Sequence, residues 1–237
     1  MIVMIYKVKL NLEWSMKYMS KYLVNNYDMI IFDCDGVLMN TNLLKCEAFG
    51  KAVEGYSEEI VNAFVENCKN TFGVSRYVKF KNFFSEFADE SYDERKYNMY
   101  LNSYANICKE IYNFADITPG VIELLKELSD FNKYLFVASG SDEQELNEAF
   151  KSRGLSGFFK GIYGSPKSKL ECVSLILNNH PHLKAVFIGD AISDLNTAKH
   201  YDMDFIYMSK YTVQSLEKDE ICRGECTITI NELSDLL

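Results

Sequence analysis

One stretch near the start of the chain constrains its fold most. The apolar run Met29–Phe32 leads directly into Asp33 and Asp35, and Gly36 follows. An uninterrupted apolar run is typical of a strand that is buried on both faces of a parallel sheet. Gly36 suits a sharp exit from that strand, because glycine adopts backbone angles that other residues avoid. Ligands of open parallel sheets bind at the carboxyl ends of strands, where both aspartates would lie.

Two carboxylates this close in sequence indicate a cation or hydrogen-bond donors beside them. Asp33 and Asp35 are mutually unfavourable as anions unless a cation or a hydrogen-bond network holds them. We therefore predict a divalent metal site with one carboxylate left to react. The alternative is a plain turn after a strand, since Asp and Gly dominate turns.

The composition indicates a globular chain with a sizeable core. Of 237 residues, 48% are hydrophobic, and three prolines and twelve glycines leave no low-complexity linker. The formal net charge of −9 argues against nucleic acid or an anionic membrane as a partner, because either would favour a basic surface. No apolar segment reaches 18 residues, so we expect no transmembrane helix. Seven scattered cysteines fit a reducing cytoplasm better than a disulfide framework.

Strand and helix patterns alternate along most of the chain and predict an α/β fold. Residues 28–39 and 116–237 show the alternation of a Rossmann-like, three-layer core with a parallel sheet and right-handed crossovers. In residues 40–115 the strand patterns disappear and aromatic residues recur at helical spacing, which predicts an inserted cap of three to five helices. Because this insertion follows the first strand, it would lie over the carboxyl end of the sheet. Residues 1–27 precede the core as an N-terminal extension.

The individual elements follow from the same patterns. The helix after the insertion is expected to begin with Thr118 as its N-cap and Pro119 as its first residue. The expected strands are 27–32, 134–138, 158–163, 185–188, 205–208 and 226–230.

Polar side chains follow three of these strands, at the edge where the carboxyl ends of parallel strands meet. Hard carboxylate oxygens suit Mg²⁺, which takes one or two carboxylates together with waters and phosphate oxygens. No histidine or cysteine pattern of ligand spacing accompanies the carboxylates, which disfavours zinc. Ser139 and the backbone N–H of Gly140 would lie at a strand-to-helix turn, where a phosphate can be cradled. The polar residues at this edge are Asp33 and Asp35, Ser139 and Gly140, and Asp190 with Asp194.

A lysine between the last two strand ends could neutralise a phosphate dianion, and the sequence offers Lys167 and Lys169. Lys169 opens a predicted helix after the N-cap candidate Ser168. A lysine at a helix N-terminus is unfavourable for the helix dipole, so its position indicates an anion nearby. This favours Lys169, with Lys167 as the alternative. No glycine-rich Walker sequence is present, so nucleotide hydrolysis of the P-loop kind is unsupported.

In this order and spacing the motifs resemble the four motifs of the haloacid dehalogenase superfamily. The resemblance extends over about residues 28–237. More narrowly, the chain looks like the phosphoglycolate phosphatase and β-phosphoglucomutase branch, in which a helical cap follows the first motif. The matching residues are Asp33-Cys34-Asp35-Gly36-Val37-Leu38, Ser139, the lysine of segment 165–169, and Gly189-Asp190 with Asp194.

The resemblance implies catalytic and metal-binding roles. Asp33 would be the nucleophile that forms an aspartyl-phosphate, and Asp35 would be the general acid and base. Mg²⁺ would be held by Asp33, by the backbone carbonyl of Asp35 and by Asp190. Asp194 would support the site through the lysine or a metal-bound water.

The resemblance also implies that Ser139, Gly140 and Lys169 hold the phosphoryl oxygens. Metal and lysine together would neutralise charge on the transferring group, which is the main task in phosphoryl transfer. Substrate contacts would come from the hinge and the cap, and the sequence does not choose among the candidates. These are Asn42, Lys45, Arg76, Lys79 and Lys81.

The implied function is a Mg²⁺-dependent phosphatase for a small phosphorylated metabolite of the sugar phosphate or phosphoglycolate type, acting as a monomer or weak dimer. One alternative is a sugar phosphomutase, but mutases of this branch carry a histidine in the helix after the first motif, near the position of Lys45. Another is a non-catalytic regulatory or binding protein, such as a receiver domain, which lacks an insertion like 40–115. A dehalogenase usually lacks the second aspartate of the first motif, so Asp35 argues against it.

Overall fold

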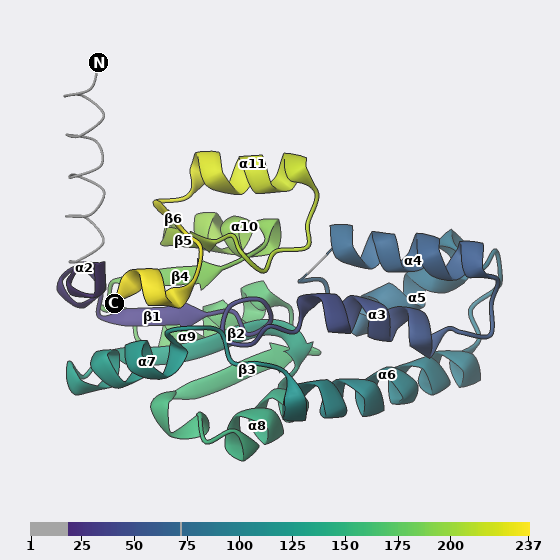
Figure 1. Cartoon of the computed structure of the whole chain (residues 1–237), viewed down its shortest axis with the longest axis horizontal. Helices are drawn as coiled ribbons and strands as arrows, with labels where there is room; N and C mark the ends of the chain where they lie inside the picture. The colour runs from purple at the N-terminus through teal and green to yellow at the C-terminus, as the bar shows by residue number, and fades with distance from the viewer. Residues whose placement is uncertain (1–18, 72) are drawn as a thin grey trace.

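Six parallel strands form the centre of the structure, a computed structural model that describes residues 19–71 and 73–237 (Figure 1). The order across the sheet is β3-β2-β1-β4-β5-β6. The alternation of these strands with helices confirms the predicted Rossmann-like α/β fold. The strands are β1 (Met29–Phe32), β2 (Tyr134–Asp142), β3 (Gly161–Ser165), β4 (Ala185–Gly189), β5 (Asp204–Met208) and β6 (Ile228–Ile230).

β1 lies in the middle of the sheet, between β2 and β4. All four of its residues are buried, as the uninterrupted apolar run predicts for a strand covered on both faces. Phe32 is paired with Val137 of β2 and with Ile188 of β4. This register brings the residues that follow Phe32, Val137 and Ile188 to the same edge of the sheet.

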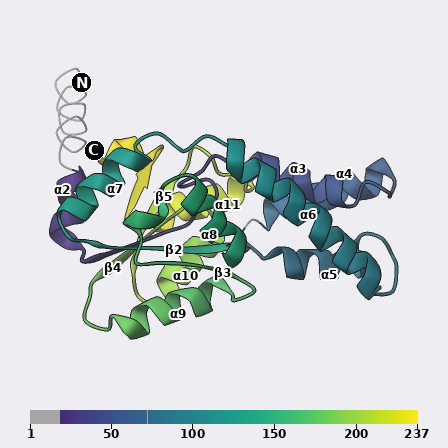
Figure 2. The same cartoon turned by 90° about the horizontal axis from the view of Figure 1, so that it is seen from below.

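Helices cover both faces of the sheet, so the core has three layers (Figure 2). On each face the apolar side chains of strands and helices form one continuous buried cluster. One face carries α2 (Met19–Asn26), α7 (Val121–Asp130), α8 (Glu143–Ser152) and the short 3₁₀ helices η1 (Ser156–Phe158) and η2 (Leu233–Leu236). The other carries α9 (Lys169–Asn179), α10 (Ile192–His200) and α11 (Leu216–Glu225).

The proposed N-terminal extension, residues 1–27, is described from residue 19 onward, and residues 1–18 lie outside the described residues. Within it, α2 packs Leu23 into the core. None of the helices in the described part of the chain is both long enough and apolar enough to cross a membrane.

Between β1 and α7, the described chain forms four helices that project beyond the carboxyl ends of the strands (Figures 1 and 2). Their aromatic side chains face one another in a separate buried cluster, as the helical spacing predicts. Phe49 stacks on Tyr104 with ring centroids 4.1 Å apart, and Phe64 meets Phe83 edge-on at 4.8 Å. The helices are α3 (Asn42–Ala52), α4 (Glu58–Asn70), α5 (Arg76–Glu86) and α6 (Glu94–Phe114).

One local expectation was wrong, and one helix was not expected from the sequence. Thr118 does not cap α7, because the helix begins later, with Gly120 as its N-cap at φ +88°. The Thr118 hydroxyl instead donates to the Val37 carbonyl, which ties the returning chain to the exit from β1. The sequence patterns did not predict α11. Among its described residues the buried side chain is Cys222, so no apolar stripe marks the helix.

Candidate active site

The polar residues predicted from the sequence lie together at the carboxyl ends of β1, β2 and β4. Some line one cavity, and the others are close to Asp33. Asp33 follows β1, and Asp190 follows β4. Ser139 and Gly140 lie within β2, which continues to Asp142 through an irregular register after Ala138. The predicted strand-to-helix turn at Ser139 and Gly140 is therefore wrong, since α8 begins only at Glu143. Both residues nevertheless line the same cavity as Asp33.

Lys169, and not Lys167, reaches the carboxylates. Its Nζ lies 3.0 Å from Asp33 Oδ2 and donates to Asp194 Oδ1, and its side chain is 5% exposed. Burial alone would lower the pKa of Lys169, but Asp194 and Asp33 raise it above its ordinary value. Lys167 instead pairs with Glu143 at 2.8 Å on the surface. The buried ammonium is therefore a fixed positive charge beside Asp33.

Asp194 also holds the turn after β4. Its Oδ2 accepts the backbone N–H groups of Asp190 (3.1 Å) and Ala191 (3.0 Å). With Oδ1 on Lys169, both oxygens of Asp194 have protein partners. This arrangement fits the supporting role that the resemblance implies, because Asp194 orients the lysine and the Asp190 backbone together.

Three buried carboxylates converge in a way that fits a hard cation. Asp33, Asp190 and Asp194 each offer one oxygen, and these oxygens lie within 4.8 Å of one another. Burial raises the pKa of Asp33 to about 6 despite the opposing effect of Lys169, and burial followed by Asp194 and Asp33 raises that of Asp190 well above its ordinary value. Asp190 Oδ1 is buried without a hydrogen-bond partner in the described structure. An all-oxygen donor set of this kind suits Mg²⁺.

These carboxylates predict a pH dependence of the metal-free protein. Folded Asp33 keeps its proton to about pH 6, whereas unfolded Asp releases it near pH ~4, so its contribution to stability falls as the pH rises through this window. In EDTA, we expect the Tm of wild type to fall more between pH 5 and 7.5 than that of Asp33→Asn, which lacks the titrating carboxyl group. Mg²⁺ should remove the difference. Equal slopes for the two proteins in EDTA would contradict this origin of the pH dependence.

Asp35 lies outside that cluster, and hydrogen-bond donors surround its side chain. Ser141 (2.5 Å), Thr41 (2.6 Å), Lys45 (2.8 Å) and Tyr112 (3.1 Å) all donate to its carboxylate. Burial alone would raise the pKa of Asp35, but Lys45 and the hydroxyl donors lower it below its ordinary value. The structure therefore holds Asp35 as a carboxylate.

Of these four donors, Lys45 was expected from the sequence as a possible substrate contact, and the other three were not. Two signals could have found some of them. Thr41 and Lys45 are four residues apart at the start of a helix and share one face. Ser141 is two residues beyond Ser139 on a strand and shares its side of the sheet. Tyr112 comes from the far end of α6, and no local pattern marks it.

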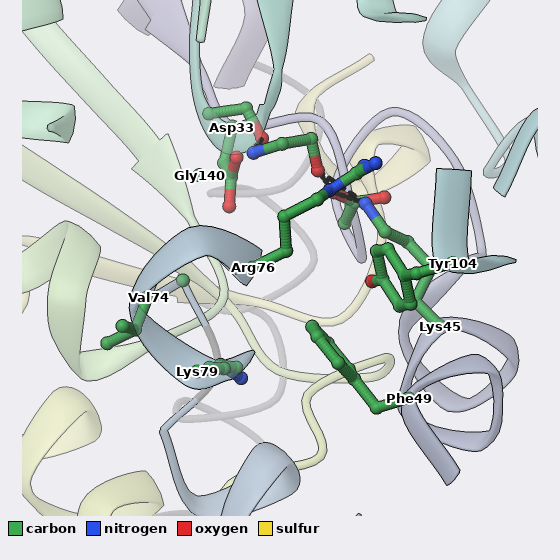
Figure 3. Close-up of a pocket in the computed structure, with 12 residues that line it drawn as sticks. Asp33, Lys45, Phe49, Val74, Arg76, Lys79, Tyr104 and Gly140 are labelled. Carbon is green, nitrogen blue, oxygen red and sulfur yellow. Dashed lines mark hydrogen bonds and ion pairs between the residues drawn. The ribbon is translucent and has the colours of Figure 1, made fainter. Parts of the chain in front are cut away.

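The inserted helices close the cavity above Asp33. Phe49, Arg76, Lys79 and Tyr104 of these helices line the cavity together with Asp33 and Gly140 (Figure 3). The cavity volume is about 30 Å³, which is room for little more than a water molecule. In this closed arrangement the cavity does not hold a molecule much larger than water.

The cap candidates differ in their positions. Arg76 and Lys79 line the cavity, and Lys79 Nζ donates to the Cys68 carbonyl at 2.9 Å. Lys81 is exposed and is not among the cavity-lining residues. Asn42, the candidate from the hinge before the cap, is not among the cavity-lining residues, and its amide donates to Asp190 Oδ2 at 2.6 Å.

A pair of charged side chains joins the insertion to the core. Both terminal nitrogens of Arg76 on α5 donate to Glu145 on α8, each at 2.6 Å, and the guanidinium lies 4.5 Å from the centre of the Tyr104 ring. Tyr77 adds a hydrogen bond to Asp142 at 2.8 Å. Bidentate charge-assisted pairs are among the stronger hydrogen bonds in proteins. This contact therefore holds the insertion against α8.

Removing the charge of Glu145 should loosen this closed arrangement. Hydrogen bonds to charged groups contribute about 1.5–3 kcal/mol, so Glu145→Gln should speed amide hydrogen exchange in α5 by about 10-fold or more. The control is Glu148→Gln, an exposed residue on the same helix whose partner is Gln144. Similar exchange in both variants would show that the Arg76–Glu145 pair does not hold the insertion in place.

Sequence and structural comparisons identify the family. A family model described as haloacid dehalogenase-like hydrolase matches residues 30–208, and the chain belongs to this family. The chain is therefore a hydrolase-family protein of the superfamily that its motifs resemble. No curated protein matches the sequence.

Solved structures share the fold over nearly the whole chain. A predicted phosphoglycolate phosphatase from Haemophilus somnus has a TM-score of 0.72 at 16% identity, with 89% of this chain and 96% of that chain covered. CbbY from Rhodobacter sphaeroides, solved with phosphate, has a TM-score of 0.70 at 16% identity and the same coverages. β-Phosphoglucomutase from Clostridium difficile has a TM-score of 0.68 at 21% identity, with coverages of 89% and 93%. At these identities the similarity establishes the fold.

Proposed function

We propose that the protein is a Mg²⁺-dependent phosphatase that hydrolyses a small phosphate ester through an aspartyl-phosphate on Asp33. The observation that carries this proposal is the position of Asp33 at the end of β1. Its carboxylate lies 3.0 Å from the buried Lys169 ammonium and faces the same cavity as Ser139 and Gly140. A nucleophile beside a fixed positive charge and polar backbone groups is the arrangement that phosphoryl transfer needs.

The residues suggest how two half-reactions would proceed. In the first half-reaction Asp35 carries a proton taken up with the substrate: an oxygen of Asp33 attacks phosphorus, the bond to the ester oxygen breaks, and the leaving oxygen takes this proton. A water then attacks the aspartyl-phosphate, Asp35 accepts its proton, and inorganic phosphate leaves while the Asp33 carboxylate is restored. The hydrogen bonds that hold Asp35 as a carboxylate favour this second role.

Asp33 and Asp190 would hold the metal ion, and Asp194 would keep the Asp190 backbone and Lys169 in place. When bound, Mg²⁺ would neutralise negative charge on the transferring phosphoryl group. Lys169 supplies a further positive charge beside the Asp33 carboxylate. Ser139 and the Gly140 N–H would hold phosphoryl oxygens.

The side chains that line the cavity support an anionic substrate. Lys45, Arg76 and Lys79 bring three basic side chains to the walls, and Phe49 and Tyr104 add aromatic surface. The names of similar structures suggest phosphoglycolate and sugar phosphates as the first compounds to test.

The test is phosphate release from a panel of phosphoglycolate, hexose 6-phosphates and hexose 1-phosphates, measured with Mg²⁺ and again with EDTA. We expect release from at least one compound, and only with Mg²⁺. Isomerised sugar phosphate with little free phosphate would instead identify a mutase. No turnover of any compound under either condition would contradict the proposal.

A further inference from the structure

The first turn of α3 uses its polar side chains in an unusual way. Thr41 occupies the N-cap position, but its hydroxyl donates to Asp35 and makes no capping hydrogen bond to the helix. The next residue, Asn42, is 1% exposed. Its amide Nδ2 donates to Asp190 Oδ2 at 2.6 Å and to the Tyr211 carbonyl at 2.8 Å. Both side chains are therefore directed to the candidate active site, and not to the helix end.

Asn42 and its partner Asp190 each have one side-chain oxygen that accepts no hydrogen bond in the described structure. With Nδ2 on two oxygens, Asn42 Oδ1 is buried and lacks a hydrogen-bond partner in the described structure, as does Asp190 Oδ1. Buried polar atoms of folded proteins almost always have a partner, so unpaired ones point to a missing ligand or water. These two oxygens belong to residues that are hydrogen-bonded to each other. One cation with its bound waters could satisfy both.

The glycine at position 36 leaves the space in which Asn42 and Asp190 contact each other. Gly36 has a φ of +77°, and a side chain there would collide with Asn42 Nδ2 and with the Asp190 carboxylate. A glycine at this point therefore allows the first helix of the insertion to approach the turn after β4. Asn42 also reaches Tyr211, in the segment after β5, so its amide is fixed from two sides.

From this geometry we infer that Asn42 is a positioning residue of the metal site: its amide orients the Asp190 carboxylate, and its carbonyl oxygen accepts a hydrogen bond from water on the bound ion. This inference rests on the proposed Mg²⁺ dependence. It also links metal binding to the insertion, because Asn42 is the first residue of α3. Groups that orient a metal ligand typically change metal affinity by about 10- to 100-fold when removed.

The direct test is Mg²⁺ binding to the EDTA-treated, dialysed protein by calorimetry, repeated with Mn²⁺ by electron paramagnetic resonance. We expect Asn42→Ala to raise Kd by about 10- to 100-fold. Asn42→Leu keeps most of the side-chain volume and should do the same, which separates loss of the amide from loss of packing. Asn40→Ala is the matched control, because Asn40 is exposed in the same hinge and should leave Kd unchanged.

A second measurement tests whether metal binding stabilises the start of α3. In wild type, Mg²⁺ should slow hydrogen exchange of the backbone amides in the first turn of α3, and this protection should be lost in Asn42→Leu. A purely structural role would lower the Tm of the metal-free variants but leave both Kd and the Mg²⁺-dependent protection unchanged, and that result would overturn the inference. If wild type bound no metal, both this inference and the metal dependence of the proposed function would fail. Normal binding by Asn42→Ala and Asn42→Leu would overturn this inference alone.

Discussion

Replacing Asp33 by Asn is expected to abolish phosphate release, lowering kcat by at least about 10⁴-fold. The amide is a far weaker nucleophile than the carboxylate and cannot form the aspartyl-phosphate. The loss should not result from unfolding. Burial raises the pKa of Asp33 to about 6. The negative charge of Asp33 at neutral pH therefore lowers the stability of the metal-free fold, and the neutral amide of Asn removes this charge.

Steady-state phosphate release and Tm in EDTA, measured on the same preparations, separate these effects. Asp190→Asn is the comparison, because it removes a proposed metal ligand but keeps the proposed nucleophile. Its activity should recover in part at high Mg²⁺ concentration, whereas that of Asp33→Asn should not. Phosphate release by Asp33→Asn at the wild-type rate would place the nucleophile on another residue.

The part of the site that could be predicted from the sequence follows from strand positions. Buried parallel strands are recognisable as apolar runs, and their carboxyl ends lie together. Asp33, Ser139 and Asp190 could therefore be placed near one another before the structure was known. Lys169 could be favoured over Lys167 because a lysine at a helix start is unfavourable without an anion.

The rest depends on contacts between residues that are distant in sequence. Tyr112 reaches Asp35 across 77 residues, and Arg76 meets Glu145 across 69. These contacts depend on where the helical insertion lies against the sheet, which no local pattern specifies. Asn42 was named as a candidate facing substrate, but the structure places its amide on Asp190. Its role could not be deduced without the bend at Gly36.

Replacing Lys169 by Met should have a large effect on both stability and catalysis. Lys169 is the buried cation between Asp33 and Asp194, and the variant leaves the three clustered carboxylates without it. Removing one partner of a buried ion pair typically costs about 3–5 kcal/mol, and loss of one electrostatic contact to the reacting group costs about 10²–10³ in kcat. Chemical unfolding in EDTA at pH 7.5 measures the first effect, and phosphate release with saturating Mg²⁺ measures the second.

Lys167→Met is the matched control, two residues away on the same segment. Lys167 is 37% exposed and pairs with Glu143, which is 33% exposed, so its loss should cost no more than about 1 kcal/mol and leave kcat near the wild-type value. The stability deficit of Lys169→Met should shrink at pH 5, because protonation of Asp33 removes one of the unpaired charges. Mg²⁺ should reduce the deficit at pH 7.5 for the same electrostatic reason, without restoring kcat. If the two lysine variants had equal stability and equal activity, the buried ammonium would be unnecessary, and the charge balance proposed for this site would be wrong.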